Sequence, residues 1–183
     1  MASRFLREAG ATLIDADYLV RVAQRRGQPA WREMWQAFGW RALKQDGEIA
    51  RRRVGYIVFA NPQEREQLND IMRPVIHSML KHEIDHFRSL GNRVLVLDVP
   101  LLIEGGLYRI VDEIWLVYSQ PEQQVQRVMA RDLVSRQTAT NRVAAQMPID
   151  DKIPFSTRIF DNTGNLETLK REVLTAWHQT IGN

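Results

Sequence analysis

Two carboxylates in the sequence lie in or next to short apolar runs, where strands of a parallel sheet would end. Asp98 lies in the run at residues 94–99, and Asp17 closes a second run at residues 11–17. The first run lacks a polar alternation, which predicts a strand buried on both faces. Ligands bind outside the carboxyl ends of strands in open parallel sheets, and Pro100 stiffens the chain just beyond Asp98. We therefore expect an active-site edge at Asp98 and a similar position at Asp17.

The composition excludes several classes of site. The chain has 183 residues, no cysteine, four scattered histidines and a net charge of +3. Without cysteine there is no thiolate nucleophile or cysteine-based zinc site. The basic residues form no aromatic-interleaved stripe, so we expect a small polyphosphate ligand rather than a nucleic acid. No apolar run approaches the roughly 20 residues needed to cross a bilayer, which predicts a cytoplasmic protein without a membrane partner.

Apolar spacing and the positions of Gly, Pro and Asn predict strands that alternate with helices. Strands are expected at residues 11–17, 94–99, 112–118 and 158–162. Helices are expected at residues 3–9, 18–25, 121–131, 135–146 and 166–181, and residues 29–90 are helical almost throughout. In that block Asn61 is the expected N-cap of a long helix, with Pro62 in its first position and Pro74 as a candidate kink. This order predicts an α/β fold with a parallel sheet.

Six short motifs occur in the order found in one enzyme family and span essentially the whole chain. They are Ile14-Asp15-Ala16-Asp17, Phe59-Ala60-Asn61-Pro62, Asp98-Val99-Pro100-Leu101-Leu102, Arg131-Asp132, Ala144-Ala145-Gln146 and Asp161-Asn162-Thr163-Gly164. In these motifs the sequence resembles the dephospho-CoA kinase family. The resemblance implies a P-loop kinase-like parallel sheet flanked by helices. It also implies a kinase core at residues 1–28 and 91–183 with a helical lid at about 127–155, and a helical substrate-binding subdomain at 29–90.

The resemblance also implies a reaction. Such kinases transfer the γ-phosphate of ATP to the ribose 3′-hydroxyl of dephospho-coenzyme A, the last step of coenzyme A synthesis, with ATP and Mg²⁺ as cofactors. Two other hypotheses stay open. One is another small-molecule kinase of the same fold, and the other is an inactive fragment or a non-catalytic binder of a coenzyme-A-type ligand.

One motif of the family does not occur in the sequence. Such kinases begin with a strand and a G-x-x-x-x-G-K-[ST] loop whose backbone N–H groups hold the phosphates. No Gly-x4-Gly-Lys occurs among the 183 residues. We expect that this strand and loop would precede the helix at residues 3–9, and that the strand at 94–99 therefore lacks a neighbour. Two explanations stay open: an internal codon taken as the start or a trimmed chain, and a degenerate relative without a competent ATP site.

Each strand-end carboxylate has a chemical and a structural interpretation. By the resemblance, Asp17 is the catalytic base that takes the proton of the sugar hydroxyl. Its alternative role is to cap the helix that starts at Tyr18, and Asp15 is expected to be structural. Asp98 falls at the position of a Walker-B-like acid that orients Mg²⁺, or it fixes the turn that follows by bonding local N–H groups.

Two arginines of the implied lid are candidates for phosphate contacts. A planar, permanently charged guanidinium suits phosphate oxygens, and the resemblance makes Arg131 the contact to the transferred phosphate and Arg142 a contact to ATP. The alternative for Arg131 is a surface salt bridge to a neighbour such as Asp132. Arg127 and Arg136 are expected to be solvated.

Other phosphate and adenine contacts are expected farther along the chain and in the helical block. Lys152, beyond the lid, fits a phosphate contact. Asn162 falls where the resemblance places an adenine-side contact, although an Asn in a turn also bonds its own backbone. Arg51, Arg52 and Arg53 meet the phosphates of dephospho-coenzyme A or form a solvated face.

Overall fold

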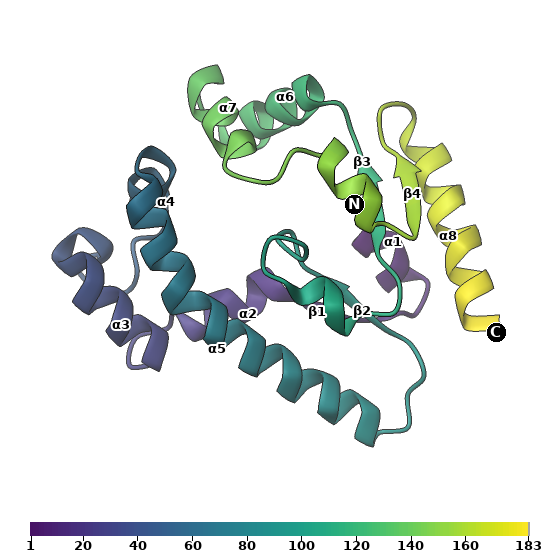
Figure 1. The fold of residues 1–183 in the computed structure, drawn as a ribbon, viewed down its shortest axis with the longest axis horizontal. Helices are drawn as coiled ribbons and strands as arrows, with labels where there is room; N and C mark the ends of the chain where they lie inside the picture. Colours follow the sequence, from purple (N-terminus) through teal and green to yellow (C-terminus); the bar gives the residue numbers. More distant parts are fainter. Residues whose placement is uncertain (183) are drawn as a thin grey trace. The chain divides into compact units, whose positions relative to one another are not determined.

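The computed structural model describes residues 1–182, in which helices alternate with four short strands (Figure 1). The strands are β1 (Thr12–Asp15), β2 (Leu95–Asp98), β3 (Trp115–Tyr118) and β4 (Arg158–Asp161). The α-helices are α1 (Ala2–Glu8), α2 (Ala16–Ala23), α3 (Pro29–Phe38), α4 (Arg51–Ala60), α5 (Pro62–Ser89), α6 (Pro121–Asp132), α7 (Arg136–Ala144) and α8 (Leu166–Gly182). Three short 3-10 helices are η1 (Gly39–Ala42), η2 (Leu107–Ile110) and η3 (Asp150–Phe155). Within residues 1–182, no helix combines the length and the apolar character that a membrane span requires.

The chain divides into two compact units. The first, called the sheet unit here, consists of Met1–Leu13 and Arg93–Asn183. The second, called the helical unit, consists of Ile14–Asn92. The boundary falls inside β1, and one helical block interrupts the strand and helix order of the sheet unit.

In the sheet unit, β3 and β4 pair in parallel, with Tyr118 opposite Asp161 at their carboxyl ends. Thr157 fixes the start of this pair. Its hydroxyl accepts a hydrogen bond from the N–H of Ile114 and donates one to the Ile114 carbonyl, both at 2.9 Å. Because the strands are parallel, both end at the same edge, where the turn after β4 and the start of α6 follow.

The predicted sheet is divided into two pairs of strands, β1 with β2 and β3 with β4. One edge of β2 is therefore paired with β1. The expectation that β2 lacks a neighbour was wrong for this edge. Within residues 1–182 no strand pairs with its other edge. All four residues of β2 are half-buried, so the prediction of a strand buried on both faces was wrong. The physical reason is that a strand needs cover on both faces and neighbours on both edges to become fully buried.

The core of the sheet unit lies between α1, α8 and the strands. Phe5 and Leu6 of α1 pack with Phe160 of β4 and with Val173 and Trp177 of α8. Each of these five side chains is at most 5% exposed. Burial of one such side chain contributes about 1.5–3 kcal/mol. The amphipathic pattern of the last helix is therefore what holds α1 and the β3–β4 pair together.

The helical unit has a core of its own. Met34 and Phe38 of α3 pack with Val54 and Val58 of α4 and with Ile71 of α5. Met34 and Phe38 are four residues apart and thus lie on the same face of α3. These contacts fix the start of α4 against α3, which positions the arginines of its first turn.

The long helix α5 begins as the sequence predicts. The side-chain oxygen of Asn61 accepts hydrogen bonds from the N–H groups of Gln63 (2.9 Å) and Glu64 (3.4 Å), so Asn61 is the N-cap. Pro62 takes the first helical position, where its missing N–H costs nothing. The helix continues beyond Pro74 to Ser89 as one element of 28 residues.

Candidate active site

The first strand-end carboxylates lie at the start of α2, in the helical unit. Asp15 is the N-cap, and its Oδ1 accepts a hydrogen bond from the N–H of Tyr18 at 3.0 Å. The helix begins at Ala16, ahead of the predicted Tyr18, because Asp15 satisfies one of its free N–H groups. Asp17 lies in the first turn with an exposed side chain. Capping is therefore the role of Asp15, and the Asp17 carboxylate is accessible to a ligand.

Asp98 is the last residue of β2 in the sheet unit. Its side chain is half-buried and accepts no hydrogen bond from any residue in 1–182. The turn that follows is held by backbone bonds instead, including those from Leu102 N–H to Val99 O (3.2 Å) and from Gly105 N–H to Leu101 O (2.8 Å). The Asp98 carboxylate is thus not used to fix this turn, contrary to the structural alternative.

Two arginines of α6 and α7 share one carboxylate in the sheet unit. Arg131 donates from Nε to Asp132 Oδ1 (2.7 Å) and from a terminal nitrogen to Oδ2 (3.0 Å). Arg142 donates to Asp132 Oδ2 from the next helix. The Arg131 side chain is 74% exposed, whereas those of Asp132 and Arg142 are 22% and 23% exposed. The predicted salt-bridge partner of Arg131 is therefore present, and it also holds Arg142.

The two arginines shift the titration of Asp132. The side-chain hydrogen bond from Arg131 is the main cause that holds the pKa of Asp132 below its ordinary value, and the charges of Arg131 and Arg142 lower it further. Partial burial of the carboxyl opposes this lowering of the pKa. Asp132 therefore stays ionised at neutral pH and keeps both guanidinium groups in place.

Arg127 and Arg136 are exposed, as expected, but each also makes a hydrogen bond. Arg127 donates to the backbone carbonyl of Asn162 at 2.6 Å, which ties α6 to the turn after β4. Arg136 donates to Glu122 at 2.6 Å, although both side chains are more than half exposed. The sequence did not predict these hydrogen bonds, because acceptors on neighbouring elements come within reach only in the folded chain.

The turn after β4 is built by Asp161 rather than by Asn162. Asp161 accepts hydrogen bonds from the backbone N–H (2.8 Å) and the hydroxyl (3.0 Å) of Thr163. The hydrogen bond from the Thr163 N–H is the main cause that lowers the pKa of Asp161. The side chain of Asn162 makes no hydrogen bond within the described residues, so the self-bonding alternative is not what the structure shows. Its amide is half-buried at the edge formed by the ends of β3 and β4.

Lys152 of η3 is a buried cation with a carboxylate partner. Its side chain is 10% exposed, and Nζ lies 2.8 Å from Oε1 of Glu104, in the segment that follows β2. The same oxygen accepts the N–H of Met147 at 3.0 Å. Oε2 of Glu104 is buried and has no hydrogen-bond partner within residues 1–182. The pair therefore joins the segment after β2 to the segment after α7.

Sequence reasoning missed Glu104, the carboxylate that holds Lys152, and it named Asp132 only as a partner of Arg131, not as one that also holds Arg142. Glu104 is the lone acid in the stretch from Val99 to Gly106, and Asp132 directly follows Arg131. An isolated acid in an apolar stretch is a signal for a buried partner, since an unpaired buried charge is costly. Sequence spacing gives no such signal for the contact between Lys152 and Glu104, which are far apart in the chain.

The sheet unit therefore carries three candidate phosphate-binding cations and a strand-end carboxylate that makes no hydrogen bond to the described residues. The cations are Arg131, Arg142 and Lys152, and the carboxylate is Asp98. No group of three or more His, Cys, Asp or Glu side chains within residues 1–182 is arranged to hold a metal ion by itself. Mg²⁺ is commonly bound by one or two carboxylates together with substrate phosphates and water, so Asp98 alone suits that mode.

An α/β unit in which a carboxylate ends a strand and arginines lie on the helices that follow has the kinds of groups that phosphoryl transfer uses. A family model described as dephospho-CoA kinase matches residues 1–168 of the chain. The chain belongs to the dephospho-CoA kinase family.

Curated relatives agree with this assignment over most of their length. A dephospho-CoA kinase of Geobacter sulfurreducens is 42% identical over 175 residues, which cover 96% of this chain and 89% of the relative. One of Carboxydothermus hydrogenoformans is 39% identical over 173 residues, which cover 94% of this chain and 84% of the relative.

Solved structures agree with the fold. TT1252 from Thermus thermophilus has a TM-score of 0.75 and 28% identity, covering 97% of this chain and 88% of that one. Dephospho-CoA kinase from Campylobacter jejuni has a TM-score of 0.68 at 21% identity, covering 98% and 90%. The predicted kinase-like α/β fold is therefore confirmed.

Proposed function

We propose that the protein transfers the γ-phosphate of ATP to the ribose 3′-hydroxyl of dephospho-coenzyme A, the last step of coenzyme A synthesis. The observation that carries this proposal is the family match over residues 1–168. That range includes all six candidate residues, which are Asp17, Asp98, Arg131, Arg142, Lys152 and Asn162. Two relatives named dephospho-CoA kinase match 94% and 96% of the chain.

Asp17 acts in this proposal as the base that accepts the proton of the attacking hydroxyl. Its exposed position in the first turn of α2, with Asp15 taking the cap, supports this role. A positioned general base contributes about 10²–10⁴-fold to a rate. In this proposal the helical unit, which contains α2, is the part of the chain that binds dephospho-coenzyme A.

Arg131 and Arg142 stabilise the charge that develops on the transferred phosphate. Asp132 holds both guanidinium groups before the ligand arrives, so their orientation costs little at the moment of reaction. Arg131 is the better exposed of the two and has donors on a planar fork that match phosphate oxygens. Arg142, more deeply placed, contacts the phosphates of ATP.

Lys152 and Asn162 complete the nucleotide contacts in this proposal. Lys152 supplies positive charge beside the segment after β2, where Glu104 fixes its position. Asn162 offers an amide that no other described residue engages, at the edge where β3 and β4 end. An amide can both donate to and accept from an adenine ring.

Asp98 is the residue that would hold Mg²⁺. Its carboxylate makes no protein hydrogen bond and ends a strand, which leaves its oxygens available as ligands. When bound, the ion neutralises charge on the phosphates of ATP.

One observation favours a second candidate function, the binding of a coenzyme-A-type ligand without phosphate transfer. The 183 residues contain no Gly-x4-Gly-Lys loop, the element whose backbone N–H groups cradle ATP phosphates in P-loop kinases. Under this alternative the chain binds dephospho-coenzyme A, but ATP and Mg²⁺ do not produce coenzyme A.

A transfer assay on the 183-residue chain separates the two candidates. The chain is incubated with ATP, Mg²⁺ and dephospho-coenzyme A, and coenzyme A is measured by mass spectrometry. Asp17→Asn is expected to lower turnover by about 10²–10⁴-fold while calorimetry shows unchanged binding of dephospho-coenzyme A.

Asp15→Asn is the matched control, because Asn caps helices as well as Asp does, and it is expected to keep both turnover and binding. Undiminished turnover in Asp17→Asn would refute the role of Asp17. Binding of dephospho-coenzyme A without any coenzyme A formed by the wild-type chain would establish the second candidate instead.

A further inference from the structure

The chain between α7 and η3 connects two of the candidate phosphate cations. Arg142 lies in the last turn of α7, and Lys152 lies in the last turn of η3. Residues 145–149 between the two helices are called the α7–η3 connection here. One oxygen of Glu104 contacts both this connection and Lys152, since Oε1 accepts the N–H of Met147 at 3.0 Å and lies 2.8 Å from Lys152 Nζ. A single carboxylate outside these helices is therefore placed to fix both cations.

The hydrogen bond to Met147 follows directly on the end of α7. The N–H groups of Ala145 and Gln146 still donate to carbonyl groups of α7, both at 3.1 Å. The N–H of Met147 is the next along the chain, and a buried or half-buried N–H needs an acceptor, which Glu104 supplies. Because these three groups are bonded one after another, a displacement of Met147 is passed to the last turn of α7, which carries Arg142.

Glu104 is itself held by the compact turn that follows β2. The side chains on both sides of it, those of Ile103 and Leu107, are only 7% and 5% exposed. The N–H of Gly105 donates to the carbonyl of Leu101 at 2.8 Å, and a Cβ at position 105 would lie 2.9 Å from that carbonyl oxygen. The turn therefore requires glycine beside Glu104, and it presents the carboxylate from a backbone with little freedom to move.

The contacts of Glu104 are not arranged for the greatest stability. Oε1 serves both Lys152 and Met147, whereas Oε2 is buried and has no hydrogen-bond partner within residues 1–182. A buried acceptor without a donor is costly, and most such groups in proteins are satisfied. Groups that cost stability are commonly kept where they serve function. The unequal use of the two oxygens therefore favours a role in geometry over a role in stability alone.

We propose that Glu104 is a positioning residue that sets the places of both Arg142 and Lys152 for phosphate binding. It acts on Lys152 directly through the ion pair, and on Arg142 through Met147 and the end of α7. Asp132 orients the guanidinium of Arg142, whereas Glu104 fixes the helix end that carries this arginine. The phosphate-binding roles of the two cations rest on the proposed function. The positioning itself rests only on these contacts.

Nitrogen-detected NMR of side chains in the 183-residue chain tests the positioning without any ligand. Glu104→Ala removes both contacts, so it is expected to shift the Nε signal of Arg142 and the Nζ signal of Lys152 and to speed the hydrogen exchange of the Met147 N–H. Glu104→Gln keeps an oxygen for Met147 but loses the charge. It should therefore change the Lys152 signal and leave the signals of Arg142 and Met147 close to those of wild type.

Glu122→Ala is the matched control. Glu122 accepts a hydrogen bond at 2.6 Å from Arg136, which lies on α7 as Arg142 does, but this pair is more than half exposed. The control is expected to leave the Arg142 signal unchanged. An unchanged Arg142 signal in Glu104→Ala, or an equal shift in Glu122→Ala, would overturn the proposal. If Glu104→Ala does not fold, an unchanged Lys152 signal in Glu104→Gln would overturn it instead.

The kinetics of phosphate transfer separate positioning from a general loss of stability. Glu104→Ala is expected to raise KM for ATP about tenfold, the effect of about one charge-assisted hydrogen bond, and to leave KM for dephospho-coenzyme A unchanged. A protein that is only destabilised loses active molecules, which lowers kcat and changes neither KM. That result, or an equal rise in both KM values, would overturn the proposal. Failure of the proposed function has a different signature: wild type forms no coenzyme A, while the shift of the Arg142 signal in Glu104→Ala persists.

Discussion

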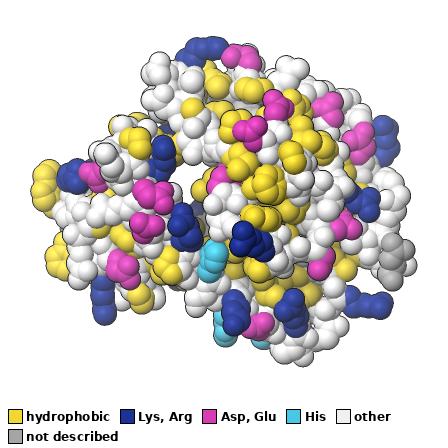
Figure 2. All heavy atoms as spheres, in the orientation of Figure 1, with side chains coloured by type: hydrophobic (Ala, Val, Ile, Leu, Met, Phe, Trp, Pro, Cys, Tyr) yellow, Lys and Arg dark blue, Asp and Glu magenta, His cyan; other side chains and the backbone are white. Residues whose placement is uncertain are grey.

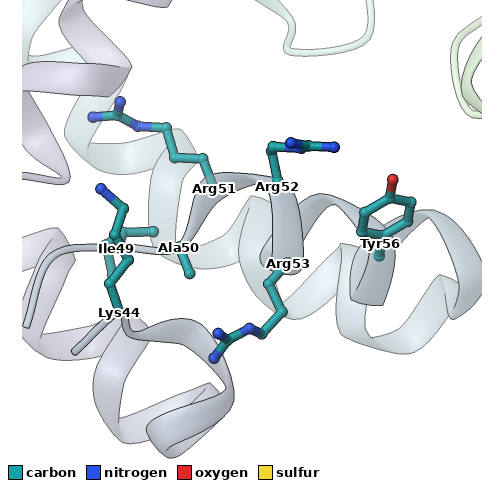
Figure 3. Close-up of a pocket in the computed structure, with 7 residues that line it drawn as sticks. All are labelled: Lys44, Ile49, Ala50, Arg51, Arg52, Arg53 and Tyr56. Atoms are coloured by element: carbon teal, nitrogen blue, oxygen red, sulfur yellow. The ribbon is translucent and has the colours of Figure 1, made fainter. Parts of the chain in front are cut away.

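The cations of the two units are held in opposite ways. In the sheet unit, Arg131 and Arg142 share the carboxylate of Asp132, and Lys152 pairs with Glu104. In the helical unit, Lys44, Arg51, Arg52 and Arg53, which lie around the start of α4 (Figure 3), have no carboxylate partner within residues 1–182. In Figure 2, Lys and Arg side chains also lie scattered over the visible face, so positive charge alone does not mark either site.

This difference separates two ways in which a cation can meet an anionic group. A cation held by a carboxylate has its position fixed before a ligand arrives, which suits a group that must stabilise a transition state of defined geometry. A cation without a partner keeps its full charge, which attracts an anionic ligand but fixes its geometry less well.

The largest loss of stability is expected when a buried cation that pairs with a carboxylate is replaced. Lys152→Met leaves the Glu104 carboxylate without its cation, and its Oε2 already lacks a partner within residues 1–182. Removal of one member of a buried ion pair costs about 3–5 kcal/mol. Urea denaturation at neutral pH is expected to show a loss of unfolding free energy near the lower end of that range, because Glu104 is partly exposed.

The double variant Lys152→Met with Glu104→Gln is the control for this experiment. It removes the unpaired charge and keeps an oxygen that can accept the N–H of Met147, so it should recover much of the loss. A single variant as stable as wild type would show that Lys152 is not held by Glu104, and the contrast between the units would fail at that point.

A smaller effect of opposite sign is expected for the cations without partners. Arg52→Glu places an acid in the first turn of α4, where the helix dipole favours negative charge, and relieves repulsion among the neighbouring cations. We expect a gain of about 1 kcal/mol in unfolding free energy. Urea denaturation measures this change.

Arg88→Glu is the matched control for Arg52→Glu. Arg88 is an exposed arginine in the last turn of α5, where a cation is favourable, so the same charge reversal should destabilise the protein slightly. Equal effects of the two reversals would contradict the view that the α4 arginines are kept at a cost in stability.

The sequence predicts the elements better than their pairing. Asn61 with Pro62 and Ser135 both start helices at the predicted residues, because capping depends on a few adjacent atoms. Burial of β2 could not be read in the same way. Its apolar run is what a central strand requires, but burial also depends on which strands lie beside it, and that is a property of the whole fold.

Candidate site residues were easier to name than their partners. Asp17, Asp98 and Arg131 stand out through their position next to strands and motifs. The contacts between Lys152 and Glu104 and between Arg127 and Asn162 join segments 48 and 35 residues apart, so no local pattern indicates them. Hydrogen bonds between distant segments are set by packing, which a motif does not encode.

The shared carboxylate of the sheet unit gives a titration prediction. Arg131→Gln is expected to raise the pKa of Asp132 toward its ordinary value, because the hydrogen bond from Arg131 is the main cause of its lowering. Arg142→Gln should raise it less. Carbon-detected NMR of the Asp132 carboxyl across acidic pH measures both, and a larger effect of Arg142→Gln would contradict the assignment of Arg131 as the main partner.

The lowered pKa of Asp132 also determines how the stability of the protein changes with pH. The pKa of Asp132 is lower in the folded state than in the unfolded chain, where it is about 3.9. The pair therefore contributes stability above the unfolded value, and that contribution is lost as the pH falls through the folded value. The difference in stability between wild type and Arg131→Gln should accordingly shrink as the pH drops below about 4.

The smallest change in stability is expected for an exposed ion pair. This pair has the short separation of the pairs described above but not their burial. Arg136 lies 2.6 Å from Glu122, a shorter separation than that of Lys152 and Glu104, but the two side chains are 62% and 51% exposed. Exposed pairs contribute about 0.2–1 kcal/mol, so Arg136→Ala should change the unfolding free energy by less than about 0.5 kcal/mol. A loss comparable to that of Lys152→Met would show that distance rather than burial sets the strength of these pairs. The comparison between the two units would then lose its physical basis, because exposure to solvent would not decide how much an ion pair contributes to stability.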